Sequence, residues 1–239
     1  MMKLEMKMSE FRLSFPACLI AGKNRLSADD LSILRSVTFP NGLRSSADAA
    51  MLLALHRAGP DKCEEWRQYF LDSLSDFVVR FSYPQGSLDE INVAWLTRML
   101  SNDGILQSPL ELDLVLRIID TSANVPPELS VFALEQLRAA LAGADGAYRL
   151  ARAIDRPGIT RHDLSFVRRV LRTAVNGSQM ALSPIEIAML ERIDQSTRPG
   201  ENHPGWAELM SAIQPRHGED RRAWRWLRVP DEMFKDDAA

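Results

Sequence analysis

The chain has 239 residues, of which 46% are hydrophobic and 26% are charged, and its formal net charge is −3. This is an ordinary soluble globular composition, and its charge balance gives no indication of binding to nucleic acid or to an anionic membrane. No apolar run approaches the ~18 residues of a membrane-spanning helix. Two cysteines, Cys18 and Cys63, are too few for a disulfide framework, so we expect reduced thiols and a cytoplasmic protein.

Residues 1–25 are predicted to form a leader segment. An apolar stretch over 13–22 follows basic residues, as it does in a secretory signal peptide. Acidic residues are mixed into the basic part, however, and Pro16 interrupts the apolar part. A leader that packs on the first helical unit is therefore our expectation, and a signal peptide is the alternative.

The first predicted unit has three helices. Two of them begin with a capping box, in which a Ser side chain and an acid three residues later accept hydrogen bonds from each other's backbone N–H groups. These boxes are formed by Ser27 with Asp30 and by Ser45 with Asp48. The helices are expected over 27–39, 45–57 and 63–81, separated by Pro and Gly breakers.

The second predicted unit repeats this order, and the first two units together cover 26–142. Its first helix is expected to be capped within Ser87–Glu90 and to end at Asn102–Gly104. Its second helix opens with Ser108, with Pro at the first helical position, where a missing N–H costs nothing. Its third helix follows Val125–Pro127.

A Gly- and Ala-rich segment, 143–158, is predicted to be a linker or a short helix, and it is the best candidate for a boundary. The third unit covers 159–215, and the remaining 216–239 form a C-terminal segment. The capping box of the third unit is formed by Thr160 with Asp163, and its later helices lie over 183–196 and around Trp206.

A short sequence repeat connects the three units. Ser108–Leu112 (SPLEL) returns as Ser183–Ile187 (SPIEI), and a looser copy stands at Ser45–Ala49. No run of alternating β-branched residues indicates a strand. The chain is therefore predicted to be all-α, with three degenerate repeats of helix-loop-helix plus a third helix packed as a compact helical array.

Short Asn-Gly and Asp-Gly sequences lie between paired helices, as in calcium-binding hands. A calcium loop needs oxygen side chains at positions 1, 3 and 5, Gly at 6 and Glu at 12. With Gly104 at position 6, Met99 and Leu110 occupy positions 1 and 12. We therefore expect these sequences to be simple turns and expect no metal or other cofactor, with Asp103 as the candidate ligand in this loop should a metal bind.

The succession of capped helix, acidic-Gly loop, Ser-x-x-Glu and apolar helix resembles the TerB-like tellurite-resistance family. The resemblance covers most of 26–215 and implies an all-helical fold with acidic residues around metal-binding loops. Carried over, the family's Asp-Gly is Asp103-Gly104, and its helix-start acids are Asp48, Glu111 and Glu186. The chain departs from that pattern by having Asn at the loop position of two units.

No catalytic constellation is evident. The four histidines show neither metal-ligand spacing nor a local Cys-His or Ser-His signature, and the glycines form no phosphate-binding loop. Distant residues can still meet in space, as catalytic triads do. We predict that the chain is not an enzyme.

The C-terminal segment has four Arg and two Trp within Arg221–Arg228. Such a stretch can bind an acidic partner, RNA or anionic lipid, although acidic residues follow it. The alternative is a last helix that packs its Trp on the core. The candidate partner-binding residues are Trp224, Arg225, Trp226 and Arg228.

The sequence thus favours a non-catalytic helical protein-interaction module with an unidentified protein partner. We expect no nucleic-acid partner and no membrane-spanning segment. The alternative, which follows from the family resemblance, is a TerB-like divalent-metal-binding or stress-response protein.

Overall fold

The structure is a computed structural model. It describes residues 20, 22–23, 25–58, 61–101, 103–152, 158–172, 175–176, 179–180 and 182–213. The predicted leader up to residue 19 and the predicted C-terminal segment lie outside these residues.

Helices make up nearly all of the regular structure, which confirms the predicted all-α class. The first helices are α2 (Ala28–Ile33) with the π-helical turn η2 (Leu34–Thr38), α3 (Ser46–Arg57), and α4 (Glu64–Ser75) with η3 (Asp76–Phe81). The middle ones are α5 (Glu90–Leu100), α6 (Pro109–Thr121), α7 (Pro127–Leu141) and α8 (Ala147–Ala151). The last are α9 (Arg161–Val170), α10 (Pro184–Gln195), the 3₁₀ turn η5 (Pro199–Glu201) and α11 (Pro204–Ile213).

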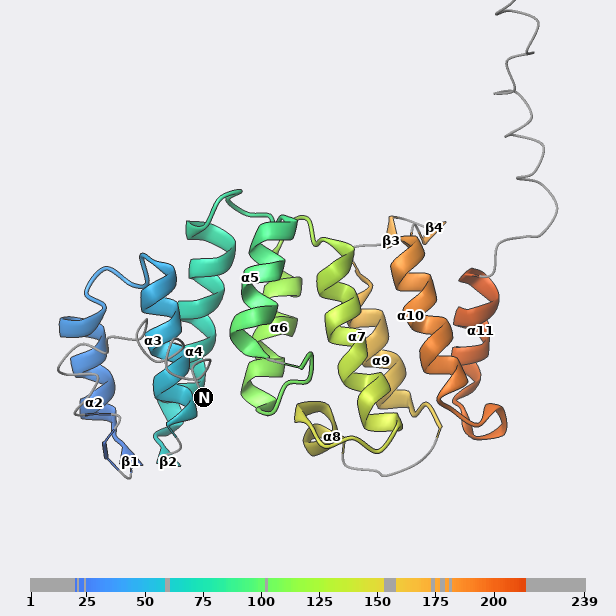
Figure 1. Cartoon of the computed structure of the whole chain (residues 1–239), viewed down its shortest axis with the longest axis horizontal. Helices are drawn as coiled ribbons and strands as arrows, with labels where there is room; N and C mark the ends of the chain where they lie inside the picture. Colours follow the sequence, from blue (N-terminus) through green and yellow to red (C-terminus); the bar gives the residue numbers. More distant parts are fainter. Residues whose placement is uncertain are drawn as a thin grey trace, which may run out of the picture.

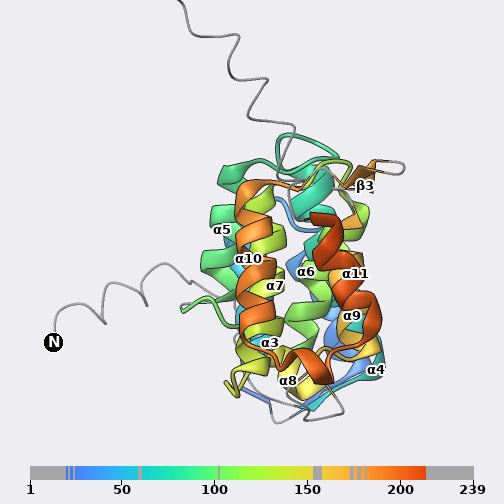
Figure 2. The ribbon, with the colours of Figure 1, turned by 90° about the vertical axis from the view of Figure 1, so that its right-hand side faces the viewer.

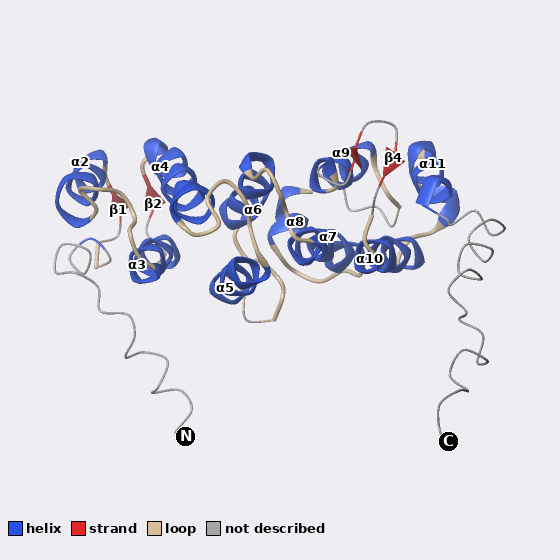
Figure 3. Cartoon of the chain, turned by 90° about the horizontal axis from the view of Figure 1, so that it is seen from above, coloured by secondary structure: helices blue, strands red, loops and turns tan. Residues whose placement is uncertain are grey.

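The long helices form two layers in a row (Figures 1 and 3). One layer holds α2, α4, α6, α9 and α11, and the other holds α3, α5, α7 and α10 (Figure 3). Seen from the α11 end, the two layers stand side by side (Figure 2). Successive helices change layer and direction, and α8 crosses the lower edge in Figure 1. Packing within a layer joins α4 to α6 and α7 to α10.

Four of the predicted capping boxes are confirmed. The N-caps are Ser27, Ser45, Thr160 and Ser183. The hydroxyl of each accepts a hydrogen bond from the backbone N–H three residues later, and the acid at that later position accepts one from the N–H of the N-cap. Each box satisfies two N–H groups that a helix start otherwise leaves unpaired.

Two further predicted helix starts are present but differ in detail. Within Ser87–Glu90, where the cap of α5 is predicted, Asp89 is the N-cap, and its carboxylate accepts from the Asn92 N–H at 2.8 Å. At α6, Ser108 is the N-cap with Pro at the first helical position, as predicted, but its side chain makes no capping bond. The side chains of Ser108 and Glu111 bond to α3, as described below.

The structure includes two small strand pairs that were not predicted from the sequence. Strands β1 (Arg25–Leu26) and β2 (Asp61–Lys62) pair in parallel, and β3 (Val175–Asn176) and β4 (Gln179–Met180) pair antiparallel. Each strand has two residues, so no alternating pattern was available to indicate it. None of them interrupts a helix. The predicted turns after α2 and α5 do contain left-handed glycines, Gly42 and Gly104.

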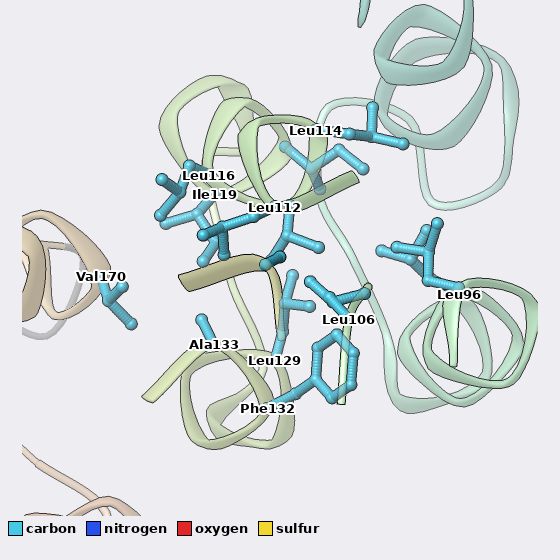
Figure 4. Packing of buried hydrophobic residues seen from close by; sticks show 14 of the residues in the cluster. Leu96, Leu106, Leu112, Leu114, Leu116, Ile119, Leu129, Phe132, Ala133 and Val170 are labelled. Atoms are coloured by element: carbon cyan, nitrogen blue, oxygen red, sulfur yellow. The ribbon is translucent and has the colours of Figure 1, made fainter. Parts of the chain in front are cut away.

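The core lies between the two layers. Figure 4 shows Leu96 of α5, Leu114 and Ile119 of α6, Phe132 of α7 and Val170 of α9 converging there. The helix predicted over 63–81 likewise buries one face, from Trp66 through Phe70 and Leu74 to Val78. Apolar residues that recur about every 3.6 positions give each helix one apolar face. Two layers are enough to bury these faces against each other.

The predicted segment 143–158 contains α8, which packs on α6 and α7. Its Tyr148 hydroxyl donates to Asp163 at 2.8 Å, and Arg152 pairs with the same carboxylate at 2.9 Å. All three side chains are buried, and burial beside Asp163 raises the pKa of Tyr148. This network ties α8 to the start of α9. The domain boundaries and the number of repeats stay predictions.

In the described part of the chain, no helix is both long enough and apolar enough to span a bilayer.

We expect Asp163→Ala to destabilise the fold by about 3–5 kcal/mol, because it leaves the buried Arg152 guanidinium without its counter-ion. Urea unfolding followed by circular dichroism measures this change. Asp145→Ala is the matched control, since that carboxylate is almost fully exposed, and it should change the free energy of unfolding by less than about 0.5 kcal/mol. Equal effects of the two substitutions would contradict this assignment.

Candidate functional site

The two metal-ligand candidates from the sequence line one pocket. Asp103 and Glu111 border a cavity of about 680 Å³ at the lower edge in Figure 1, where α3 and α5 end and α6 begins. His56, Arg57 and Ser108 also line this pocket. Their positions follow from the antiparallel order, which brings the C-terminus of α3 to the N-terminus of α6. The candidates Trp224, Arg225, Trp226 and Arg228 lie outside the described residues.

An ion pair closes one side of the pocket. The Glu111 carboxylate, only 2% exposed, accepts from Arg57 Nε at 2.8 Å, and Arg57 Nη2 donates to the Leu100 carbonyl at 2.7 Å. Burial raises the pKa of Glu111, against the lowering effects of Arg57 and of the Ser108 backbone. A single guanidinium thus joins α3, α5 and α6.

A second polar contact lies beside this ion pair. His56 Nε2 is 2.9 Å from Ser108 Oγ, and the imidazole ring packs on Phe70 with ring centroids 4.6 Å apart. Burial, together with the charges of Lys62 and Arg57, lowers the pKa of His56 to about 4. The ring is therefore neutral at pH 7.

The tautomer of His56 decides whether this Ser-His pair can act as a nucleophile and base. His56 Nδ1 is buried and has no hydrogen-bond partner. Nδ1 is therefore unsatisfied in either neutral tautomer, and the tautomer sets which side chain donates in the contact between His56 Nε2 and Ser108 Oγ. In the described part of the chain, no acid accepts a hydrogen bond from Nδ1, as the third member of a catalytic triad does. The contact joins the end of α3 to the start of α6.

The carboxylates of the pocket already have hydrogen-bond partners within the protein. Asp103 Oδ1 accepts from the Ile105 N–H at 3.0 Å and from the Ser101 hydroxyl at 3.1 Å, which shapes the turn. These bonds lower the pKa of Asp103. Glu111 already has a cation, Arg57. Among the described residues, no three His, Cys, Asp or Glu side chains are placed to share an ion. The metal-binding alternative stays an untested prediction.

The opposite end of α3 lies beside a different kind of surface. We define the apolar edge as Val37, Phe81, Tyr83 and Ile91, which are 60%, 41%, 85% and 77% exposed. They belong to the ends of η2 and η3, the following turn and the start of α5, all at the upper edge in Figure 1. This surface is apolar where the pocket at the other end of α3 is polar.

A cavity of about 500 Å³ adjoins the apolar edge. It is lined by the turn before α3, including Arg44, and by the last turns of α4 and η3, including Phe77 and Phe81. The rings of Phe77 and Phe81 stack with centroids 5.9 Å apart, and Trp95 meets Phe77 edge-on at 5.8 Å. The Arg44 guanidinium lies over Phe81, 5.1 Å from the ring centroid.

This second surface was not predicted from the sequence. Phe77 and Phe81 lie in the helix predicted over 63–81, and Tyr83 follows that helix. The available signal was an aromatic residue directly before a Pro-Gly-containing turn, where a buried position is not expected.

Comparison of the protein with models of known families, with curated proteins and with solved structures finds no match. The resemblance to the TerB-like family is therefore neither supported nor opposed by these comparisons.

The depressed pKa of His56 makes stability depend on pH. Between the ordinary value of 6.5 and about 4, the unfolded chain binds a proton that the folded chain does not, so stability is lost as pH falls through this window. We expect His56→Gln to remove about 2 kcal/mol of this loss, after allowing for solvent screening of a half-buried ring.

Urea unfolding at pH 7.0 and 4.5 tests this expectation. The raised pKa of Glu111 acts in the opposite direction, but it is common to both proteins, so their difference isolates His56. His162→Gln, at an exposed position, serves as the control. A pH dependence that is the same in the wild type and in His56→Gln would contradict the burial argument.

Proposed function

We propose that this protein is a non-catalytic helical protein-interaction module that binds a partner protein through the apolar edge. One observation carries this proposal: four large hydrophobic side chains are exposed where α2, α4 and α5 meet the same edge of the array. Exposed apolar side chains of this size can mark a protein interaction site.

The composition of this surface supports a protein partner. Aromatic residues and arginine dominate the residues that contribute most to binding in protein interfaces. Tyr83 and Phe81 are available at the edge, and Arg44 and Arg80 border the adjoining cavity. Phe81 stacks on Phe77, so that its ring needs little ordering on binding.

The polar pocket at the other end of α3 is less suited to binding. Its principal charged and hydrogen-bonding groups, Arg57, Glu111, His56 and Ser108, are bonded to one another. Because these groups bond to one another, the pocket needs no ligand to explain its polar residues. We also propose a cytoplasmic location, on the cysteine usage alone.

Affinity purification with the full-length protein as bait, from a lysate of its source cells, tests the proposal. We expect a protein that is retained by the wild type and lost with the triple variant Val37→Ser/Tyr83→Ser/Ile91→Ser. Leu150→Ser is the matched control, because Leu150 is 71% exposed but lies on α8 at the opposite edge. The partner should then form a complex with the purified protein.

The expected loss on the triple variant is at least about tenfold in affinity, since three exposed apolar anchors are removed. Retention of every captured protein by the triple variant would contradict an interface at the apolar edge.

A further inference from the structure

We propose that the cavity beside the apolar edge receives a segment of the partner protein in which a large apolar side chain stands next to a carboxylate. This inference rests on the proposed function and specifies the chemistry of its partner. It is carried by the Phe77 and Phe81 rings in the cavity lining and by the Arg44 guanidinium, which has no carboxylate partner among the described residues.

The apolar half of the site is formed by aromatic rings. Phe77 and Phe81 line the cavity, and the stacking of Phe77 against Phe81 and Trp95 fixes their orientation. The cavity of about 500 Å³ shares Phe81 with the apolar edge. A ligand that inserts one apolar side chain here also covers part of the apolar edge, and a peptide segment does both.

The charges that line the cavity are balanced except for one. Arg80 pairs with Asp76 at 3.2 Å, and Asp72 pairs with Arg117. Arg44 Nε donates to the Asn41 carbonyl at 2.8 Å. Across the part of the protein that the structure describes, no carboxylate lies within ion-pair distance of the Arg44 guanidinium. The Asp48 carboxylate accepts from the backbone N–H of Arg44, not from its side chain.

The placement of Arg44 favours a carboxylate ligand. Its stacking on Phe81 and its bond to Asn41 restrict the guanidinium, while its terminal nitrogens stay available. A planar guanidinium with two available N–H groups binds a carboxylate through two parallel hydrogen bonds. An Asp or Glu side chain, or the α-carboxylate of a polypeptide, next to the inserted apolar residue supplies that group.

A displayed library of random dodecapeptides, selected on the immobilised full-length protein, is the probe. We expect enrichment of peptides with an aromatic or large aliphatic residue beside a carboxylate. A synthetic peptide of the enriched sequence should lose about 10- to 100-fold in affinity when its carboxylate is changed to the amide, as expected for a charge-assisted hydrogen-bonded pair. Fluorescence anisotropy measures both affinities.

Substitution of Arg44 gives the complementary measurement. Arg44→Gln should lower the affinity for the carboxylate peptide by as much as the change to the amide does. The Arg44→Gln protein should bind the acid peptide and the amide peptide with equal affinity. Arg44→Lys should give an intermediate affinity, because lysine keeps the positive charge but cannot donate two parallel hydrogen bonds to one carboxylate. Arg161→Gln, at an exposed arginine on α9, is the control and should bind like the wild type. Unfolding curves confirm that each variant is folded.

Two results overturn the inference: enrichment of peptides without a carboxylate, or equal binding of the acid peptide to the wild type and to Arg44→Gln. The proposed function has a separate outcome. If binding of a captured partner depends on Val37, Tyr83 and Ile91 but not on Arg44, the proposed interaction module is supported and the carboxylate site is contradicted. If binding depends on none of the four residues, both proposals are contradicted.

Discussion

Every helix leaves backbone N–H groups at its start and C=O groups at its end without partners inside the helix. In an antiparallel array these ends lie together along the edges, so the way each end is satisfied shapes the surface there. Several starts in this protein use a capping box, as Ser183 and Glu186 do. At α6, Ser108 and Glu111 bond across to His56 and Arg57 at the end of α3. The positive start of α6 and the negative end of α3 favour these charges.

This junction gives the two edges of the array different roles. At the lower edge, polar groups bond to one another and join α3, α5 and α6, and among them the Glu111 carboxylate is buried. At the upper edge, the last turns of η2 and η3 bring Val37 and Phe81 to the surface. The partner binding that we propose for the upper edge does not involve the polar groups of the lower edge. The fold thus separates what positions the helices from what we propose binds the partner.

Much of the fold was predictable from local sequence, because capping boxes and apolar periodicity act within one helix. The buried face from Trp66 to Val78 and the caps at Ser27 and Thr160 are examples. The polar junction was not predictable in this way. Ser108 and Glu111 have the same spacing as Ser183 and Glu186, and only the packing of α3 against α6 changes their partners. The apolar edge depends on which helix ends meet, and no local pattern encodes that.

The most direct test of this account is a double-mutant cycle on Arg57 and Glu111, measured by urea unfolding at pH 7. The single variants are Arg57→Gln and Glu111→Gln, and the cycle compares their sum with the double variant. If the α3–α6 junction is formed as described, the two substitutions are coupled by about 1 kcal/mol or more. Changes that add within about 0.3–0.5 kcal/mol would show that the two residues do not interact, and would contradict the junction.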